Sequence, residues 1–128
     1  MVVKRIVANI ASPEPAAARA FYGDVLGLEI AMDHGWIVTF AAPELLLAPQ
    51  LSIASQGGSD TVVPHLSIEV DDLDEVLQRA RAAGLTIEYG PRQEPWGVRR
   101  FYVRDPFGRL VNILAHAGNR GASDAQAP

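Results

Sequence analysis

The chain has 128 residues, 48% of them hydrophobic, which is enough for one compact domain with its own core. Its net charge of −4 disfavours nucleic acids and anionic membrane surfaces, so we expect neither as a partner. The absence of cysteine excludes disulfides, thiolate metal sites and thiol nucleophiles. No long apolar run follows Lys4 and Arg5, so we expect no signal peptide or membrane span, and a cytoplasmic protein.

The sequence begins with a predicted strand and a predicted helix. Residues 2–10 are rich in β-branched side chains, and their alternation places Arg5, Val7 and Asn9 on one face. Prolines within residues 12–15 then mark the start of a helix over residues 16–26, which Gly27 ends. The side chains that we expect this helix to bury are Ala17, Ala20, Phe21 and Val25.

Three further strands complete the first half of the chain. We expect them at residues 28–32, 36–40 and 45–54. Asp33, His34 and Gly35 form a turn of the kind that joins a hairpin. Residues 55–61 are rich in small polar residues and glycine, which predicts a flexible linker.

The clearest pattern in the chain follows this linker. Residues 65–70 alternate polar and apolar side chains, with His65, Ser67 and Glu69 on one face, and this predicts a strand covered on its other, apolar face. A helix comes next, with Asp71 as its N-cap and Gly84 at its end. Its predicted buried stripe consists of Leu73, Val76, Leu77 and Ala80.

The last part of the chain predicts three more strands, at residues 85–89, 98–104 and 109–115. Prolines and glycines mark residues 90–97 as a loop, and Asp-Pro-Phe-Gly at residues 105–108 is a strong turn signal. Residues 118–128 are small and polar without periodicity, so we expect a disordered tail.

Both halves therefore share one order of elements: a strand, a helix and three strands. This indicates an internal duplication, with module one at about residues 3–54 and module two at about residues 62–115. Neither half could easily bury its sheet alone, so we expect one domain over residues 1–117. The predicted fold class is α+β, in which two βαβββ modules form a curved eight-stranded sheet around a cavity.

Four short motifs resemble the vicinal oxygen chelate superfamily, which includes glyoxalase I, extradiol dioxygenases, fosfomycin-resistance enzymes and bleomycin-resistance proteins. They are AFYGDVLGL at residues 20–28, HLSIEVDDL at residues 65–73, PWG at residues 95–97 and DPFG at residues 105–108. Their order and spacing extend the resemblance over roughly residues 3–115. The resemblance implies the paired-module fold and a homodimer whose cavity lies at or near the subunit contact.

The resemblance also implies where a metal ion would bind. Metal-dependent members hold a divalent cation with a histidine or glutamate from the first strand of each module and a carboxylate from the last strand of each. His65 falls on one such position, but Arg5 and Asn112 fall on two others, and the fourth lies near Gln50 or Ser52. A divalent ion typically needs three or more protein ligands. We therefore expect no bound metal or other cofactor; a divalent ion with His65 as one ligand is the alternative.

Several ionisable residues are candidates for chemistry. His65 and Glu69 share a strand face and are the best candidates for general acid–base catalysis. The alternative is that they are polar side chains hydrogen-bonded inside a wet cavity. His34, in a turn, and His116, past the last predicted strand, are expected to face solvent. The Arg99-Arg100 pair could bind an anion, although only one of them points inward on an alternating strand and a solvated surface is the default interpretation.

Aromatic and amide side chains are candidates for a ligand site. Helices cover only one face of the predicted sheet, so some aromatic residues are expected on the other face, where they would suit a small molecule. Trp96 is the strongest candidate for contact with a ligand or another subunit. Asn9 and Asn112 could orient a ligand, or could bond each other or buried water. The predicted ligand-binding residues are Arg5, Asn9, Trp36, His65, Trp96, Tyr102 and Asn112.

Three functions remain open, and we favour the first. It is a small-molecule-binding protein, similar to bleomycin-resistance proteins and without a bound metal, that sequesters a hydrophobic or aromatic compound. The second is a divalent-metal-dependent lyase, isomerase or dioxygenase similar to glyoxalase I. The third is an accessory domain without independent activity. The negative net charge adds a weak preference for a cationic ligand.

Overall fold

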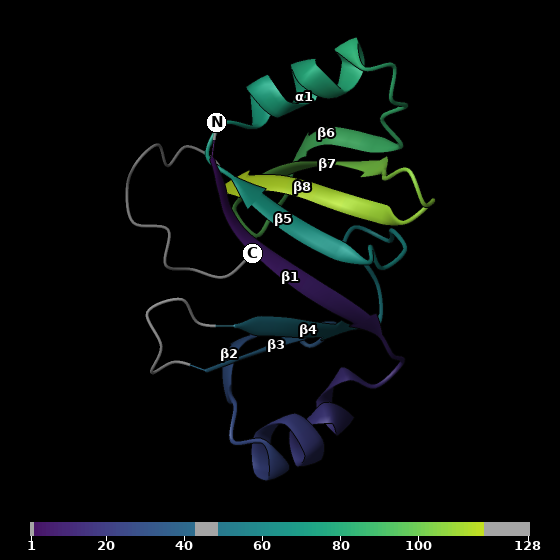
Figure 1. Ribbon diagram of the computed structural model, residues 1–128. Coiled ribbons are helices and arrows are strands. Elements are labelled where there is room, and N and C mark those ends of the chain that lie inside the picture. Colours follow the sequence, from purple (N-terminus) through teal and green to yellow (C-terminus); the bar gives the residue numbers. More distant parts are fainter. Residues whose placement is uncertain (1, 43–48, 117–128) are drawn as a thin grey trace. The chain divides into compact units, whose positions relative to one another are not determined.

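The computed structural model describes residues 2–42 and 49–116 (Figure 1). Its strands and helices are, in chain order, β1 (Val3–Ala11), η1 (Pro15–Ala18), η2 (Arg19–Val25), β2 (Glu29–Asp33), β3 (Ile37–Ala41), β4 (Gln50–Ala54), β5 (Leu66–Val70), α1 (Leu73–Ala82), β6 (Tyr89–Gln93), β7 (Val98–Arg104) and β8 (Leu110–His116). The predicted tail and the start of the strand predicted at residues 45–54 lie outside the described residues. Within the described ranges, none of the helices has the length and hydrophobicity needed to cross a membrane.

The strands form one mixed sheet in the order β2-β3-β4-β1-β5-β8-β7-β6. The pairs β1–β4 and β5–β8 are parallel, whereas β2–β3, β3–β4, β6–β7 and β7–β8 are antiparallel. The predicted fold class, α+β with two βαβββ modules and an eight-stranded sheet, is confirmed. The central cavity and the module limits stay predictions.

The chain divides into two compact units, one made of residues 7–63 and the other of residues 2–6 with residues 64–116. Strand β1 therefore contributes its first residues to one unit and its last residues to the other. Each unit contains the same pairing pattern, a parallel strand pair extended by two antiparallel strands. This repeated pattern is what an internal duplication requires.

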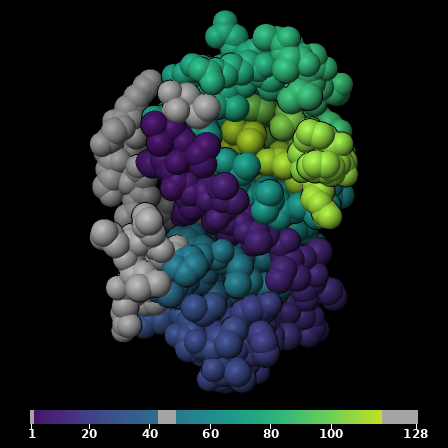
Figure 2. Space-filling view, viewed as in Figure 1, coloured from purple at the N-terminus to yellow at the C-terminus, as the bar shows by residue number. Residues whose placement is uncertain are grey.

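Helix α1 packs against one face of β5, β7 and β8 (Figure 1). Leu73, Leu77 and Ala80 are buried as predicted, and Val76 is partly buried against the same core. In the space-filling view, the side chains of α1 gather next to those of β8 (Figure 2). The strand residues of this core are Val70, Phe101, Val103, Val111 and Ile113. Each large apolar side chain contributes about 1.5–3 kcal/mol on burial, so this layer fixes which face of each strand points away from α1.

The start of α1 differs from the prediction by one residue. Asp72, not Asp71, is the N-cap, because Asp72 is extended and its carboxylate accepts a hydrogen bond of 3.1 Å from the Glu75 N–H. The Asp71 carboxylate instead accepts one of 2.8 Å from the Val2 N–H. Gly84, at a φ of 81°, follows the helix end as predicted.

The first helix is wound differently from the prediction. A four-residue 3₁₀ turn, η1, is followed by a seven-residue π-helix, η2, and neither has the 3.6-residue period on which the predicted buried face depended. Phe21 and Val25 are 54% and 70% exposed, and Ala17 and Ala20 are exposed as well, so the predicted burial is wrong. Tyr22 packs against the core instead.

The strand predicted at residues 85–89 begins four residues later than expected, and of the loop predicted at residues 90–97 only residues 94–97 form a turn. Strand β6 spans Tyr89–Gln93 and pairs with β7, with a bulge between Tyr89 and Arg92. Gly90 has a φ of 79°, and β6 is an edge strand of the sheet. Glycine and proline here mark a bulge on an edge strand, where both residues are tolerated.

Gly90 yields a stability prediction with a matched control. A Cβ added at Gly90 would lie 2.5 Å from the Arg100 carbonyl oxygen, whereas one added at Gly97 (φ 95°) would meet nothing within 4 Å. Both alanine variants carry the left-handed penalty of about 1–2 kcal/mol, but only Gly90→Ala adds a backbone clash. We expect Gly90→Ala to lose clearly more free energy of unfolding than Gly97→Ala in urea denaturation. Equal losses would contradict the close approach of β6 to β7.

Candidate functional site

Buried polar side chains gather on the face of the module-two strands opposite α1. Side chains alternate along a strand, so the residues between those that pack on α1 point to this other face. Its buried polar members are at most 8% exposed. We call this set the polar face, and it consists of Ser67, Glu69, Arg100, Tyr102 and Asn112.

One row of the polar face runs across all four strands. Ser67, Asn112, Tyr102 and Tyr89 are successive cross-strand partners. Asn112 Nδ2 donates a hydrogen bond of 3.1 Å to Ser67 Oγ, whereas Asn112 Oδ1 is buried without a hydrogen-bond partner in the part of the chain that the structure describes. The rings of Tyr89 and Tyr102 lie 5.1 Å apart. The row therefore combines aromatic surface with an unsatisfied acceptor.

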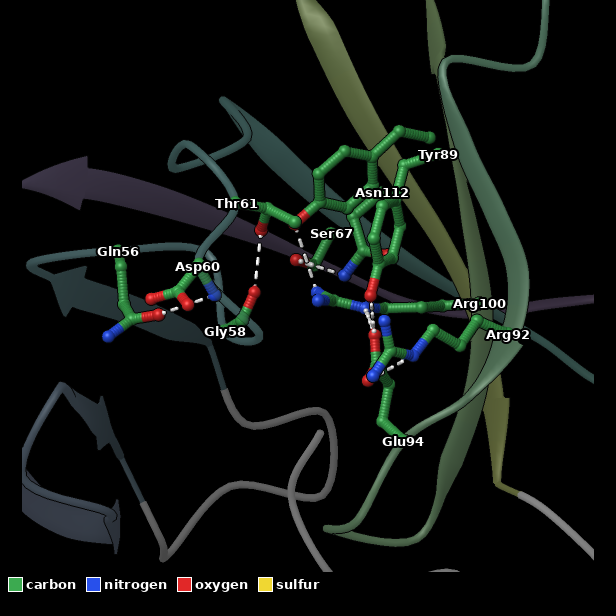
Figure 3. Close-up of polar contacts among 11 residues, drawn as sticks. Gln56, Gly58, Asp60, Thr61, Ser67, Tyr89, Arg92, Glu94, Arg100 and Asn112 are labelled. Atoms are coloured by element: carbon green, nitrogen blue, oxygen red, sulfur yellow. Dashed lines mark hydrogen bonds and ion pairs between the residues drawn. The ribbon is translucent and has the colours of Figure 1, made fainter.

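The next row contains a buried ion pair (Figure 3). Arg100 Nε donates to Glu94 Oε2 at 2.7 Å, and the two side chains are 3% and 0% exposed. Tyr89 Oη donates to the same carboxylate oxygen at 2.7 Å, and Arg100 Nη1 donates to Tyr102 Oη at 3.0 Å. The Arg100 Cζ atom lies 5.0–5.2 Å from the ring centroids of Tyr89, Trp96 and Tyr102. Trp96 is thus placed beside the polar face.

These contacts correct one expectation and add one residue. Strand alternation separates the two arginines as expected, with Arg99 on the α1 side of β7 and Arg100 on the other side. Arg100 is only 3% exposed, so the default interpretation of a solvated surface is wrong for it. Arg99 bonds Asp74 of α1 at 2.6 Å. The role of Glu94 as the buried partner of Arg100 was not predicted. Its only distinguishing feature is its position between β6 and β7.

Basic groups surround Glu69 at the opposite end of this second row. Its carboxylate lies 2.9 Å from Arg5 Nη2, 3.8 Å from Lys4 Nζ and 2.8 Å from His116 Nδ1. His116 is only 12% exposed, so the prediction that it faces solvent is wrong. Strand β8 extends one residue further than predicted and places His116 on the same face as Asn112.

His65 lies apart from this carboxylate. It precedes β5, is exposed, and its backbone N–H donates to the Leu110 carbonyl oxygen at 2.8 Å. His65 interacts electrostatically with Asp105, which lies in the predicted turn. The Arg109 N–H is the main cause that lowers the pKa of Asp105, and the Phe107 N–H and the charges of Arg109 and His65 act in the same direction. The imidazole that contacts the Glu69 carboxylate is that of His116, not that of His65.

Asn9 and Trp36 belong to the unit of residues 7–63. Asn9 is the cross-strand partner of Ser52, whose hydroxyl lies 2.7 Å from that of Thr39. Trp36 is half-buried just before β3, and its ring stacks on His34 with centroids 6.1 Å apart. A role for Asn9 and Trp36 in ligand binding stays a prediction.

The residues at the implied metal positions do not suit a divalent cation. Asn112 offers a neutral amide in place of a carboxylate, and the basic groups around Glu69 would repel a cation. Among the described residues, no three His, Asp or Glu side chains lie close enough together to hold a metal ion. The donor set at this face therefore differs from the one that the resemblance implies.

Comparison with protein families now places the chain. The model of the glyoxalase/bleomycin resistance protein/dioxygenase superfamily matches residues 4–113. The chain belongs to this superfamily. The resemblance drawn from the four sequence motifs is thereby confirmed. No curated protein matches the chain.

Solved structures share the fold at low sequence identity. An NAD-dependent benzaldehyde dehydrogenase from Legionella pneumophila is 18% identical, with a TM-score of 0.68 over 88% of this chain and 99% of that one. A superfamily member from Vibrio splendidus 12B01 is 17% identical, with a TM-score of 0.60 over 90% and 99%. Methylmalonyl-CoA epimerase from Mycobacterium tuberculosis is 20% identical, with a TM-score of 0.58 over 90% and 87%. These similarities show a common fold.

The buried ion pair predicts strong coupling between Glu94 and Arg100. Glu94→Gln leaves the guanidinium buried without its carboxylate, and Arg100→Met leaves the carboxylate without its closest cation, so each variant should lose about 3–5 kcal/mol of unfolding free energy. The double variant should lose clearly less than the sum, because both charges are gone. Urea denaturation of the four proteins measures this cycle. Strictly additive losses would contradict the pairing.

Proposed function

We propose that the protein binds a hydrophobic or aromatic small molecule at the polar face and sequesters it without a bound metal. The observation that carries this proposal is the row of Ser67, Asn112, Tyr102 and Tyr89, in which an unsatisfied buried acceptor lies beside aromatic rings. Binding sites for small molecules typically combine apolar and aromatic walls with a few placed polar groups. A buried acceptor without a partner costs about 1–3 kcal/mol, which a ligand donor would recover.

The fixed geometry of the site supports binding as well. Arg100 is held by Glu94 and Tyr102, and its guanidinium orders the rings around it. A site whose side chains are already held in place costs less conformational entropy when a ligand arrives. The homodimer that the resemblance implies and the cytoplasmic location expected from the sequence stay predictions.

The alternative function is a divalent-metal-dependent lyase, isomerase or dioxygenase similar to glyoxalase I. Solved structures with the same fold include methylmalonyl-CoA epimerases from Mycobacterium tuberculosis and Streptomyces coelicolor, so the fold is compatible with enzymes. In this chain the alternative would require metal ligands beyond His65. The two functions therefore differ in a quantity that is simple to measure, the metal content.

Metal content is the first measurement. The chain should be purified without a chelator or a nickel column, dialysed, and analysed by elemental mass spectrometry before and after addition of Zn²⁺, Mn²⁺ or Fe²⁺. We expect far less than one ion per chain, because the amide of Asn112 and the basic groups near Glu69 oppose a cation. One tightly held ion per chain would overturn the proposal in favour of the metal-dependent enzyme, and His65→Ala would then test that ligand.

Ligand binding is expected to change the emission of Trp96. The chain has two tryptophans, so a Trp36→Phe variant reports on Trp96 alone. A series of aromatic compounds should quench this emission saturably, because Trp96 packs on the Arg100 guanidinium beside the polar face. N-acetyltryptophanamide serves as the control for collisional quenching. Linear quenching that matches the control for every compound would contradict the proposed site.

A further inference from the structure

Asn112 carries the clearest sign of what the ligand must contain. One end of its amide is used, since Nδ2 donates to Ser67 Oγ at 3.1 Å. The other end, Oδ1, is buried and has no hydrogen-bond partner within the described residues, while the side chain is 6% exposed. Folded proteins pair nearly all such buried groups with protein or ordered water. An unpaired acceptor at this depth therefore points to a partner outside the described residues, either ordered water or a ligand that displaces it.

The neighbours of this acceptor define the shape of that partner. Tyr102 is the direct cross-strand partner of Asn112, and Tyr89 is the partner of Tyr102. Directly opposed side chains on one face of a sheet lie about 4.5–5.5 Å apart at their Cβ atoms. A group that reaches Asn112 Oδ1 thus lies next to a tyrosine ring. Planar aromatic molecules pack well on such a surface.

We propose that Asn112 Oδ1 accepts a hydrogen bond from a neutral O–H or N–H group of an aromatic ligand, as in a phenol or an indole. This inference rests on the proposed function and specifies the chemistry of its ligand. An ammonium donor gains less here, because Asn112 Oδ1 is a neutral amide oxygen and the nearby Glu94 carboxylate is already paired with Arg100. The inference therefore replaces the preference for a cationic ligand that net charge alone indicates.

The direction of the hydrogen bond depends on which end of the amide meets Ser67. With the two ends exchanged, the Ser67 hydroxyl would donate to Oδ1 and the amide N–H would face the ligand. The ligand would then have to present an acceptor, such as a ketone oxygen. A test must therefore compare a donor, an acceptor and a compound without a donor on the same aromatic body.

The test uses three naphthalenes with the full chain in EDTA. Affinities of 2-naphthol, 2-methoxynaphthalene and 2-acetylnaphthalene are measured by tryptophan fluorescence and confirmed by calorimetry. We expect 2-naphthol to bind about tenfold or more tightly than its methyl ether, as loss of a donor to a buried acceptor implies. Asn112→Leu should remove this difference, whereas Asn112→Asp, which keeps an acceptor, should retain it. Gln93→Ala, at an exposed amide of β6, should leave both affinities unchanged.

The outcomes separate this inference from the proposed function. Saturable but equal binding of 2-naphthol and the methyl ether overturns the inference and leaves the proposed function standing. A preference for 2-acetylnaphthalene that Asn112→Asp abolishes overturns the donor assignment, because it means that the amide N–H faces the ligand. Failure of all three compounds to bind counts against the proposed function as well. The comparison of ligands on the unmodified chain decides the inference even if an Asn112 variant does not fold.

Discussion

Packing of α1 on one face of β5, β7 and β8 is the constraint on which the rest of module two depends. Once Phe101, Val111 and Ile113 face the helix, strand alternation leaves Arg100, Tyr102 and Asn112 no choice but the other face. A shift of one residue in any strand would exchange the two sets and bury charge under the helix. The hydrophobic layer thus sets the positions of polar groups that it does not touch.

The buried charges on the polar face have a different role from that layer. Removing Arg100 and Glu94 from water is costly, and their attraction repays that cost only with good geometry and further hydrogen bonds. Both conditions are met, since Tyr89 and Tyr102 bond the pair and three aromatic rings surround the guanidinium. The pair also ties the β6–β7 hairpin to the polar face and so keeps Trp96 in place. Its contribution is better described as positional than as a gain in stability.

Much of this arrangement follows from the sequence, because periodicity and turn chemistry are local properties. The alternation at residues 65–70 correctly separated Ser67 and Glu69 from Ile68 and Val70, but only the apolar face was predicted to be covered, whereas Glu69 is buried as well. The motif at residues 105–108 predicted a turn, and in that turn Asp105 accepts hydrogen bonds from two backbone N–H groups. The register of β5 with β8, which brings Ser67 to Asn112, depends on pairing between distant segments. No local pattern indicates such a pairing.

Three errors in the predictions each have a cause of their own. The burial of Arg100 depends on Glu94, which lies beyond a bulged edge strand that the glycine and proline of residues 90–91 disguised as a loop. His116 was expected to face solvent because β8 was predicted to end one residue early. In the structure it is the last residue of β8, so its side chain lies against the sheet. The first helix failed because its 3₁₀ and π windings break the period from which a buried face is inferred.

The two modules use corresponding positions for different purposes. In module one, the cross-strand partners Thr39 and Ser52 alternate with core residues of β3 and β4, and their hydroxyls bond each other at 2.7 Å. In module two, the corresponding strands β7 and β8 place Tyr102 opposite Asn112. The first pair is small and bonds within itself, whereas the second is large, aromatic and leaves an acceptor open. Once a duplication has supplied two copies of a sheet, one copy can satisfy its polar groups with short hydroxyl side chains while the other is free to diverge, as the proposed ligand site requires. On this argument, the proposed binding of a small molecule would depend on the tyrosines and the amide of module two rather than on a pair of symmetric metal-ligand sets.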